Sequence, residues 1–458
     1  MSESAPMEGS ERMSAVDRAW LLMERPTNPM MVVALLVFAT PLDYGRLREL
    51  VAKRFLAFAR FRCRPVADTL GARWVPQPDF DLSDHVLRVA LPGGAGQAEL
   101  EALVGQLAST QLSAQRPLWT FHLVEHYRKG SALIIRIHHC YADGIALARV
   151  MLSLGEPGRK TKRPRGAHSS SQASVVDLLS QVVGVAADAV GKGVHYALHP
   201  DEAAGLAGEL ARIAVLPDDP QTCLKGALSG VRHVTWAEPF PLEPVRTSAR
   251  VLGCTINDVL VAALAGALGS YLESCGDTLT GGTIRAAVPV NLRSDAEAPI
   301  TLGNHFGLVF LELPVGIRHP LERVYAVHAM MQKLKGSPQA LVTLGLLAVV
   351  GSLPAVVEEP VMATFSAKAS LVASNVPGPR QPLHFAGVPA SQAMFWVPQA
   401  GSIGVGVSML TYNGEVQFGV MSDRALIAQP RGVAQRMRSE LEDLVRLAPS
   451  GAEPPPRD

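Results

Sequence analysis

Cysteine is scarce in this chain, and its scarcity argues against a disulfide framework and a cysteine-based metal centre. The 458 residues include only five, odd in number and widely spaced: Cys63, Cys140, Cys223, Cys254 and Cys275. No CxxC pair and no Cys/His spacing typical of zinc ligands is present. We therefore expect a reduced, cytoplasmic protein with no metal and no cofactor.

The sequence also lacks an excess of charge of one sign, and we expect no signal peptide. Lys and Arg total 42 against 41 Asp and Glu, a net charge of +1, so we expect no nucleic-acid partner. Residues 1–13 mix Glu, Ser and Pro and lack the apolar core of a signal peptide. Nothing in the sequence indicates an oligomeric state.

Apolar runs of membrane-spanning length are rare. Residues 336–357 carry no charge and have about the length that a bilayer requires, but proline, glycine and hydroxyl residues interrupt them. We interpret this segment as a buried or interfacial helix, with a membrane span as the alternative. Because 48% of the residues are hydrophobic, we also expect peripheral contact with a membrane or a lipid droplet.

The most informative stretch that is present reads His-His-Cys-Tyr-Ala-Asp-Gly, residues 138–144. It follows a predicted strand at 131–137 and precedes a predicted helix at 145–154. Successive strand side chains point to opposite faces, so only one of His138 and His139 can face a given cavity. An imidazole is costly to bury without a partner, which favours a functional role for His139 at the end of its apolar strand face.

Structural explanations compete for the neighbouring residues. His138 fits a hydrogen-bonded core histidine. Asp143 fits the N-cap of the following helix as well as it fits a site residue, and Gly144 is expected to relieve the backbone where that helix opens. Cys140 is a rival nucleophile, but a small apolar packing role suits it better.

Four motifs together resemble a known family. His-His-x-x-x-Asp-Gly looks like the signature of acyltransferases built like chloramphenicol acetyltransferase. Pro117-Leu118-Trp119, Asn257-Asp258 and the segment Ser374-Asn375-Val376-Pro377-Gly378-Pro379 resemble the other marks of bacterial wax ester synthases/diacylglycerol acyltransferases. The four occur in the family's order over most of the chain.

Strands and helices alternate in both halves, which predicts an α/β fold with mixed sheets. The resemblance implies two chloramphenicol acetyltransferase-like sandwich domains with the active-site channel between them. We expect an N-terminal domain at 1–154, a basic, Ser-rich linker with a helical connector at 155–222, a C-terminal domain at 223–448 and a Pro-rich tail at 449–458. The basic run in the linker is interpreted as a solvated tether, with contact to anionic lipid or CoA phosphates as the alternative.

The resemblance also implies the chemistry. His139 would be the general base that takes the proton of a long-chain alcohol or a diacylglycerol as its hydroxyl attacks the thioester of acyl-CoA. His138 would support the strand end. Asp143 would hold the loop by pairing with an arginine, for which we expect Arg293.

Other motif residues are expected either to line the channel or to have a structural role beside it. Asn257 is a candidate oxyanion donor or channel residue, although Asn257 and Asp258 can equally cap the helix that follows. Residues expected along the channel are Gly144, Asn257, Asp258, Ser374 and Asn375. Residues expected to be structural are Pro117, Leu118, Trp119, Pro377 and Gly378.

Two other functions use the same observations. The first is acyl transfer or condensation with a different acceptor or a carrier-protein donor, which residues 138–144 alone do not distinguish. The second is a catalytically silent lipid-binding or droplet-coating protein, against which the intact His139 and Asp143 argue. Residues 374–379 and Asn257 favour the CoA-dependent O-acyltransferase.

Overall fold

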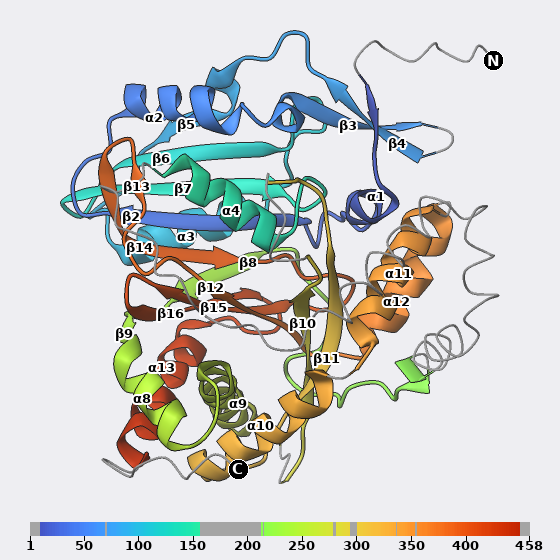
Figure 1. Cartoon of the computed structure of the whole chain (residues 1–458), viewed down its shortest axis with the longest axis vertical. Coiled ribbons are helices and arrows are strands. Elements are labelled where there is room, and N and C mark those ends of the chain that lie inside the picture. Colours follow the sequence, from blue (N-terminus) through green and yellow to red (C-terminus); the bar gives the residue numbers. More distant parts are fainter. Residues whose placement is uncertain are drawn as a thin grey trace, which may run out of the picture.

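Two β-sheets lie one above the other and carry the fold (Figure 1). The computed structural model describes residues 10–68, 71–155, 212–213, 215–277, 281–293, 300–335, 337–352 and 355–448. The first sheet has six strands in the order β13-β14-β2-β7-β6-β5. Its strands are β2 (Met31–Phe38), β5 (Val86–Val89), β6 (Trp119–Tyr127), β7 (Gly130–His138), β13 (His384–Phe385) and β14 (Val388–Trp396).

The second sheet mixes parallel and antiparallel pairs. Its main order is β11-β10-β12-β15-β16-β8, and β9 pairs with β16 beside that path. The strands are β8 (Arg232–Trp236), β9 (Phe240–Pro241), β10 (Ile284–Asn291), β11 (Phe306–Leu313), β12 (Leu371–Pro377), β15 (Val405–Tyr412) and β16 (Glu415–Asp423). Strand β12 runs parallel to both of its neighbours, β10 and β15. The predicted mixed-sheet α/β fold is confirmed.

Helices flank the two sheets (Figure 1). In the N-terminal half they are α1 (Ala15–Leu22), α2 (Tyr44–Leu50), α3 (Gln97–Ala108) and α4 (Gly144–Leu154). In the C-terminal half they are α8 (Leu242–Val251), α9 (Ile256–Cys275), α10 (Pro320–Lys335), α11 (Gln339–Ser352), α12 (Ala355–Ala367) and α13 (Arg431–Leu447). A smaller sheet, β1-β4-β3, joins β1 (Glu11–Arg12), β3 (Cys63–Asp68) and β4 (Gly71–Pro76).

Strong local patterns correspond to observed elements. The nearly unbroken apolar run at 30–38 is too short to span a membrane and predicts a buried strand; it forms β2, whose residues are almost all buried. The turn Arg128-Lys129-Gly130 predicts a hairpin, and it joins β6 to β7 in antiparallel register. Asn413 and Gly414 have φ values of 51° and 78°, the left-handed backbone that a tight hairpin between β15 and β16 requires.

Two strands, β13 and β14, leave the C-terminal half and join the first sheet. β14 pairs antiparallel with β2, from Ala390 opposite Phe38 to Trp396 opposite Val33. Buried side chains of β2, β14, β8 and β16 then meet between the two sheets, among them Met31, Trp236 and Trp396. The chain bounds that we predicted for the two domains stay a prediction, and residues 156–211 of the predicted linker lie outside the described residues.

Helix α9 is buried on nearly every side, as its uniformly apolar sequence predicts. Thr255 caps its N-terminus, and Gly276, at a φ of 89°, ends it in the left-handed conformation. Among the described helices, α9 is the single continuous helix that is long and apolar enough to cross a bilayer. However, 72% of its most apolar stretch is buried inside the protein. It packs against α10 and α13 as a core helix.

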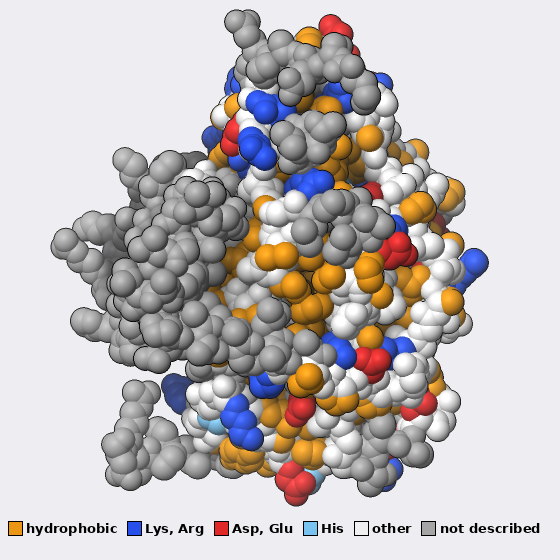
Figure 2. Space-filling view, turned by 90° about the vertical axis from the view of Figure 1, so that its right-hand side faces the viewer, with side chains coloured by type: hydrophobic (Ala, Val, Ile, Leu, Met, Phe, Trp, Pro, Cys, Tyr) orange, Lys and Arg blue, Asp and Glu red, His pale blue; other side chains and the backbone are white. Residues whose placement is uncertain are grey.

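The segment expected as one helix at 336–357 forms α11 and the start of α12. Helix α11 packs on α1 so tightly that a Cβ at Gly351 would lie 1.7 Å from the carbonyl oxygen of Ala15. Val349 points outward and is 55% exposed. Figure 2 turns this side of the molecule toward the reader and shows hydrophobic side chains across its middle.

Candidate active site

The turn between β7 and α4 presents the two histidines in opposite directions. β7 ends at His138 and α4 begins at Gly144. Asp143 is the N-cap of α4, because its Oδ1 accepts a 2.8 Å hydrogen bond from the backbone N–H of Ala146. The local structure predicted from the sequence is therefore confirmed.

His138 is fully partnered inside the protein. Its Nε2 lies 2.8 Å from a carboxylate oxygen of Glu24, and its Nδ1 accepts a 3.1 Å hydrogen bond from the backbone N–H of Cys140. It is 2% exposed and is not among the residues that line the cavity described below. These contacts support the structural role that we predicted for it.

His139 lies at the edge of an apolar cavity with one nitrogen unpartnered. Its ring stacks on Trp20 with centroids 4.0 Å apart and lies 5.5 Å from the ring of Phe306. Nδ1 is buried without a hydrogen-bond partner among the described residues. Burial lowers the pKa of His139 to about 4, against an opposing effect of Asp143. The imidazole is therefore neutral at neutral pH, the form that can accept a proton.

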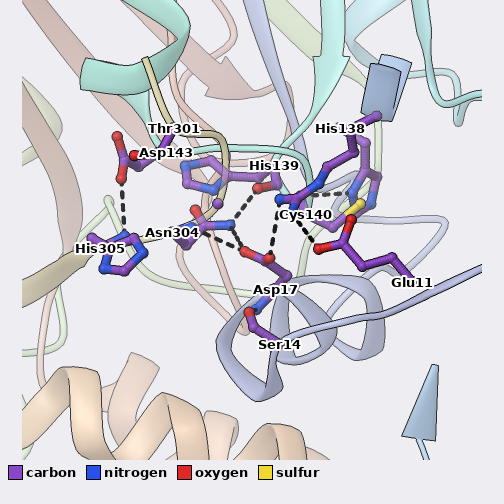
Figure 3. Close-up of polar contacts among 12 residues, drawn as sticks. Glu11, Ser14, Asp17, His138, His139, Cys140, Asp143, Thr301, Asn304 and His305 are labelled. Atoms are coloured by element: carbon purple, nitrogen blue, oxygen red, sulfur yellow. Dashed lines mark hydrogen bonds and ion pairs between the residues drawn. The ribbon is translucent and has the colours of Figure 1, made fainter. Parts of the chain in front are cut away.

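A buried ion pair holds the loop that carries His139. The expected partner of Asp143 is present, because Nη2 of Arg293 lies 2.9 Å from Oδ2 of Asp143 and both side chains are almost completely buried. The same carboxylate oxygen accepts a 2.9 Å hydrogen bond from the backbone N–H of His305 (Figure 3). The loop of the N-terminal half is thus fixed to Arg293 and His305 of the C-terminal half.

The cavity beside His139 has a volume of about 370 Å³ and lies between the two halves of the chain. Asp143 and Gly144 lie with His139 on one wall. Most of the remaining lining is apolar and comes from β10, β11, β12, α12 and the segment after β14. Its apolar members include Ala287, Pro289, Leu308, Phe310, Met362, Phe365, Val372, Val376, Val397 and Ile403. Such a space suits a hydrocarbon chain.

A second cavity of about 690 Å³ adjoins the first at β12. Asn375 and Pro377 line both cavities, whereas Asn257 and Gly378 line only the second. Nδ2 of Asn375 donates a 2.8 Å hydrogen bond to Oδ1 of Asn257. The motif at 374–379 and the motif at 257–258 therefore meet in space, as residues of one channel would.

Arg246 and Arg380 also line the second cavity. Arg246 forms an ion pair with Glu243, and Arg380 is exposed. Arginine is the side chain best suited to bind phosphate groups. The second cavity thus differs from the His139 cavity in offering positive charge.

Asn257 lines the second cavity but not the His139 cavity. Two expectations about other site residues are wrong. Asp258 lines neither cavity, because its carboxylate caps α9 by accepting from the Thr255 backbone N–H at 2.9 Å and pairs with Nδ1 of His328 at 2.7 Å. Gly144 has no left-handed φ, and a Cβ there would meet no atom within 4 Å. It lines the cavity but relieves no backbone strain.

The cap at Asp258 also explains a cluster of potential metal ligands. Donor atoms of Cys254, Asp258 and His328 lie within 4.8 Å of one another. The Asp258 oxygen already accepts hydrogen bonds from Thr255 and His328. It also lies at the positive end of the α9 dipole, where a cation is disfavoured.

The remaining motif residues frame the site. The backbone N–H of Leu118 donates a 3.0 Å hydrogen bond to the Tyr141 hydroxyl, and the carbonyl oxygen of Leu118 accepts a 2.9 Å hydrogen bond from the backbone N–H of His138. The ring nitrogen Nε1 of Trp119 donates a 2.7 Å hydrogen bond to the carbonyl oxygen of Phe61. These contacts support the structural role predicted for Pro117-Leu118-Trp119. Ser374 lines the His139 cavity beside Asn375.

Glycine is required where the strand β12 ends. A Cβ at Gly378 would lie 2.5 Å from the carbonyl oxygen of Thr411 on the neighbouring strand. The backbone N–H of Gly378 donates a 2.8 Å hydrogen bond to that same oxygen. Pro377 and Gly378 thus end β12, which supports the structural role expected for them.

Asp17 and Asn304 are site residues that the sequence did not reveal. Asp17 looks like an N-cap, but Ser14 caps α1 instead. Oδ1 of Asp17 accepts hydrogen bonds from the backbone N–H of Asn304 at 2.9 Å and from its Nδ2 at 2.8 Å. The same Nδ2 donates 2.8 Å to the carbonyl oxygen of His139. These partners are 165 and 287 residues apart in the chain, so no local pattern marks them.

Comparison with known proteins identifies relatives along the whole chain. A model described as the wax ester synthase/diacylglycerol acyltransferase catalytic domain matches residues 13–260, and a WS/DGAT C-terminal domain model matches residues 302–445. A putative diacylglycerol O-acyltransferase of Mycobacterium bovis is 30% identical over 85% of this chain and 84% of its own length. A probable diacylglycerol O-acyltransferase of Mycobacterium tuberculosis shows the same identity and coverage.

Solved structures share the fold at lower identity. A wax ester synthase/diacylglycerol acyltransferase from Marinobacter aquaeolei matches with a TM-score of 0.68 and 22% identity, over 96% of this chain and 99% of that one. The first condensation domain of the calcium-dependent antibiotic synthetase matches with a TM-score of 0.62 and 14% identity, over 97% of each chain. The wax ester synthase/diacylglycerol acyltransferase and the condensation domain therefore both share the fold of this chain.

Proposed function

The chain belongs to the wax ester synthase/diacylglycerol acyltransferase family of O-acyltransferases, and from this premise we propose that it transfers the acyl group of a long-chain acyl-CoA to a long-chain alcohol or a diacylglycerol. The products are a wax ester or a triacylglycerol together with free CoA. The observation that carries the proposal is the neutral imidazole of His139 at the edge of a largely apolar cavity.

The reaction follows from the position of that imidazole. His139 takes the hydroxyl proton as the alcohol oxygen attacks the thioester carbonyl, which increases the nucleophilicity of the oxygen as the C–O bond forms. The tetrahedral oxyanion then collapses and the C–S bond breaks. The imidazolium returns the proton to the departing CoA sulfur, so the base is regenerated.

The two cavities suggest how the substrates divide. The His139 cavity is walled by hydrocarbon side chains and would hold the acyl chain and the reacting groups. The second cavity, with Arg246 and Arg380, would receive the phosphates of CoA. The pantetheine arm would then pass Asn257 and Asn375, whose amides match its own, and bring the thioester to His139. Ser374 and Asn375 are the candidates for an oxyanion donor on this path, because both line the His139 cavity.

Peripheral contact with a membrane or lipid droplet is part of the proposal. Met362 and Phe365 of α12 are half-buried and also line the His139 cavity. Helix α12 therefore lies between that cavity and the face on which hydrophobic side chains gather in Figure 2. A lipid acceptor that leaves a bilayer at this face would have a short, apolar path to the imidazole. Flotation with liposomes tests this contact, and a protein that stays entirely unbound would contradict it.

The proposed activity is tested by competition between acceptors. The purified protein is given labelled palmitoyl-CoA together with hexadecanol and a diacylglycerol, and the labelled esters are separated. We expect ester formation with at least one acceptor and stoichiometric CoA release. Ester formation that is undiminished in His139→Ala would overturn the assignment of the base.

A second comparison separates the proposal from condensation chemistry. The same acyl group is offered on CoA and on a phosphopantetheinylated carrier protein, with hexadecanol as the acceptor. We expect the CoA thioester to be the better donor. A clear preference for the carrier protein would favour condensation, which the resemblance of fold alone does not exclude.

A further inference from the structure

The imidazole of His139 has two nitrogens, and only one of them can meet a substrate. Nδ1 is buried, without a hydrogen-bond partner among the described residues. Nε2 must then be the proton acceptor for the reaction. A neutral imidazole accepts at Nε2 only in the tautomer that carries its proton on Nδ1. Catalysis by His139 therefore requires something that selects this tautomer.

Asn304 is the polar side chain placed to do so. Its Oδ1 is buried and, like Nδ1 of His139, has no hydrogen-bond partner in the part of the chain that the structure describes. Asn304 lies next to the His139 ring in Figure 3, and it is close enough to oppose the effect of burial on the pKa of His139. The two unpartnered atoms thus belong to neighbouring side chains and are a donor and an acceptor.

The orientation of the Asn304 amide is fixed by chemistry. Its Nδ2 lies 2.8 Å from a carboxylate oxygen of Asp17 and 2.8 Å from the carbonyl oxygen of His139. Both of these groups only accept hydrogen bonds, so the NH₂ group must face them and the oxygen must face elsewhere. Asp17 is itself 2% exposed and lies 3.7 Å from Nη1 of Arg60, which balances its charge.

We propose that Asp17 and Asn304 form a positioning relay for His139. Asp17 holds the amide of Asn304, and the amide oxygen accepts the Nδ1 proton of the imidazole, so that the lone pair of Nε2 faces the cavity. When Nε2 takes the proton of the acceptor hydroxyl, the Nδ1–H bond to Asn304 strengthens and Asp17 stabilises the new positive charge through the amide. The proton on Nδ1 stays in place throughout.

This relay rests on the proposed function of His139 as the base. One other acceptor competes for the Nδ1 proton, because the carbonyl oxygen of His139 itself also lies near the ring. That oxygen already accepts from Asn304. His138 and Asp143 also act on the charge of the ring. His138 is itself paired with Glu24, and Asp143 with Arg293 and the backbone of His305.

Nuclear magnetic resonance of the full chain, labelled with ¹⁵N-histidine, tests the relay directly. His139→Ala identifies the His139 signals by their loss. We expect the parent protein to show the Nδ1–H tautomer at His139 at pH 7. In Asn304→Ala the Nε2–H tautomer should become populated. An unchanged tautomer in Asn304→Ala would show that the ring's own carbonyl holds the proton, and the relay would be wrong.

Kinetics and matched variants complete the test. We expect Asn304→Ala to lower kcat at least about tenfold with little change in KM, because the relay touches no substrate. Ser14→Ala weakens the cap of α1 next to Asp17 and should lower the melting temperature without changing the tautomer. If Asn304→Ala does not fold, Asn304→Ser keeps a donor for Asp17 but withdraws the acceptor from the ring, and the same tautomer change is expected.

The relay and the proposed function fail in different ways. If His139→Ala is inactive while both Asn304 variants keep the tautomer and kcat of the parent, only the relay is overturned. If His139→Ala is as active as the parent, the base assignment fails whatever the tautomer is.

Discussion

The wall of the cavity that holds His139 differs from the wall that faces it in how its side chains are fixed. On the His139 side, buried charged and polar groups are held by hydrogen bonds and ion pairs, as in Asp143–Arg293 and Asp17–Asn304. On the opposite side, residues such as Val372 and Phe310 pack in an apolar cluster. Directional bonds fix a reacting atom in place, whereas apolar packing fixes only a shape. We therefore expect changes to the first wall to act on rate and stability, and changes to the second to act on substrate choice.

Replacing the two adjacent histidines gives the largest expected contrast. His139→Ala should lower kcat by about 10²–10⁴-fold, the usual contribution of a general base. His138→Ala should affect kcat far less but destabilise the protein by about 1–3 kcal/mol, because buried partners such as the Cys140 N–H lose their acceptor. Initial rates and urea unfolding of both variants measure the difference. Equal loss of rate in both variants would contradict the separation of roles.

Breaking the buried ion pair comes next. Asp143→Ala should destabilise the protein by about 3–5 kcal/mol, because it leaves Arg293 buried without its counter-charge. Asp43 is a matched control, since it also N-caps a helix through its side chain but is exposed. Asp43→Ala should cost only about 1 kcal/mol. Similar unfolding midpoints for the two variants would show that Asp143 acts as a cap alone.

Altering the apolar wall should change selectivity with little loss of stability. Val372 lies on β12 and lines the cavity. Val372→Phe should lower kcat/KM for palmitoyl-CoA or hexadecanol about tenfold relative to a short-chain substrate, since a methylene group is worth about 1–3 kcal/mol in an apolar pocket. Val372→Ala should shift the preference toward longer chains. Equal effects on all chain lengths would place the hydrocarbon elsewhere.

The smallest expected effect is that of pH on kcat/KM near neutrality. Because burial lowers the pKa of His139 to about 4, the base form dominates above that value. We expect kcat/KM to be flat between about pH 6 and 8 and to fall as the pH drops toward 4, whereas an ordinary histidine would give an inflection near 6.5. An inflection above pH 6 in a pH–rate profile would contradict the neutral, desolvated imidazole.

The same shift has a consequence for stability. The unfolded chain binds a proton at His139 below about pH 6.5, whereas the folded chain does so only near pH 4. Unfolding therefore takes up a proton between these values, and the free energy of unfolding should decrease as the pH falls through this window. His139→Ala should remove this part of the decrease, which urea unfolding at a series of pH values would detect.

Sequence patterns predicted the elements whose signals are local. The strand before His138, the cap at Asp143 and the apolar helix α9 all follow from residues close together in the chain. The Asp143–Arg293 pair was expected only through the family resemblance. Asp17, Asn304 and the pairing of β14 with β2 were not predicted, because each depends on residues brought together from opposite ends of the chain. A carboxylate in the first turn of a helix is too common to indicate a contact with a distant amide.

The pairing of β14 with β2 restricts how the enzyme can admit its substrates. A hinge motion that moved the C-terminal half of the chain as one body away from the N-terminal half would have to break the backbone ladder from Ala390–Phe38 to Trp396–Val33 and disturb the tryptophans packed behind it. A catalytic cycle that required such a disruption would be slow. Local displacement of α12, or of the side chains around Asn375, is therefore the less costly way for substrates to enter the cavity. For the same reason, neither half is expected to fold when it is expressed without the other: cutting the chain between β12 and β13 removes the neighbour of β2 and leaves an apolar strand edge open to aggregation.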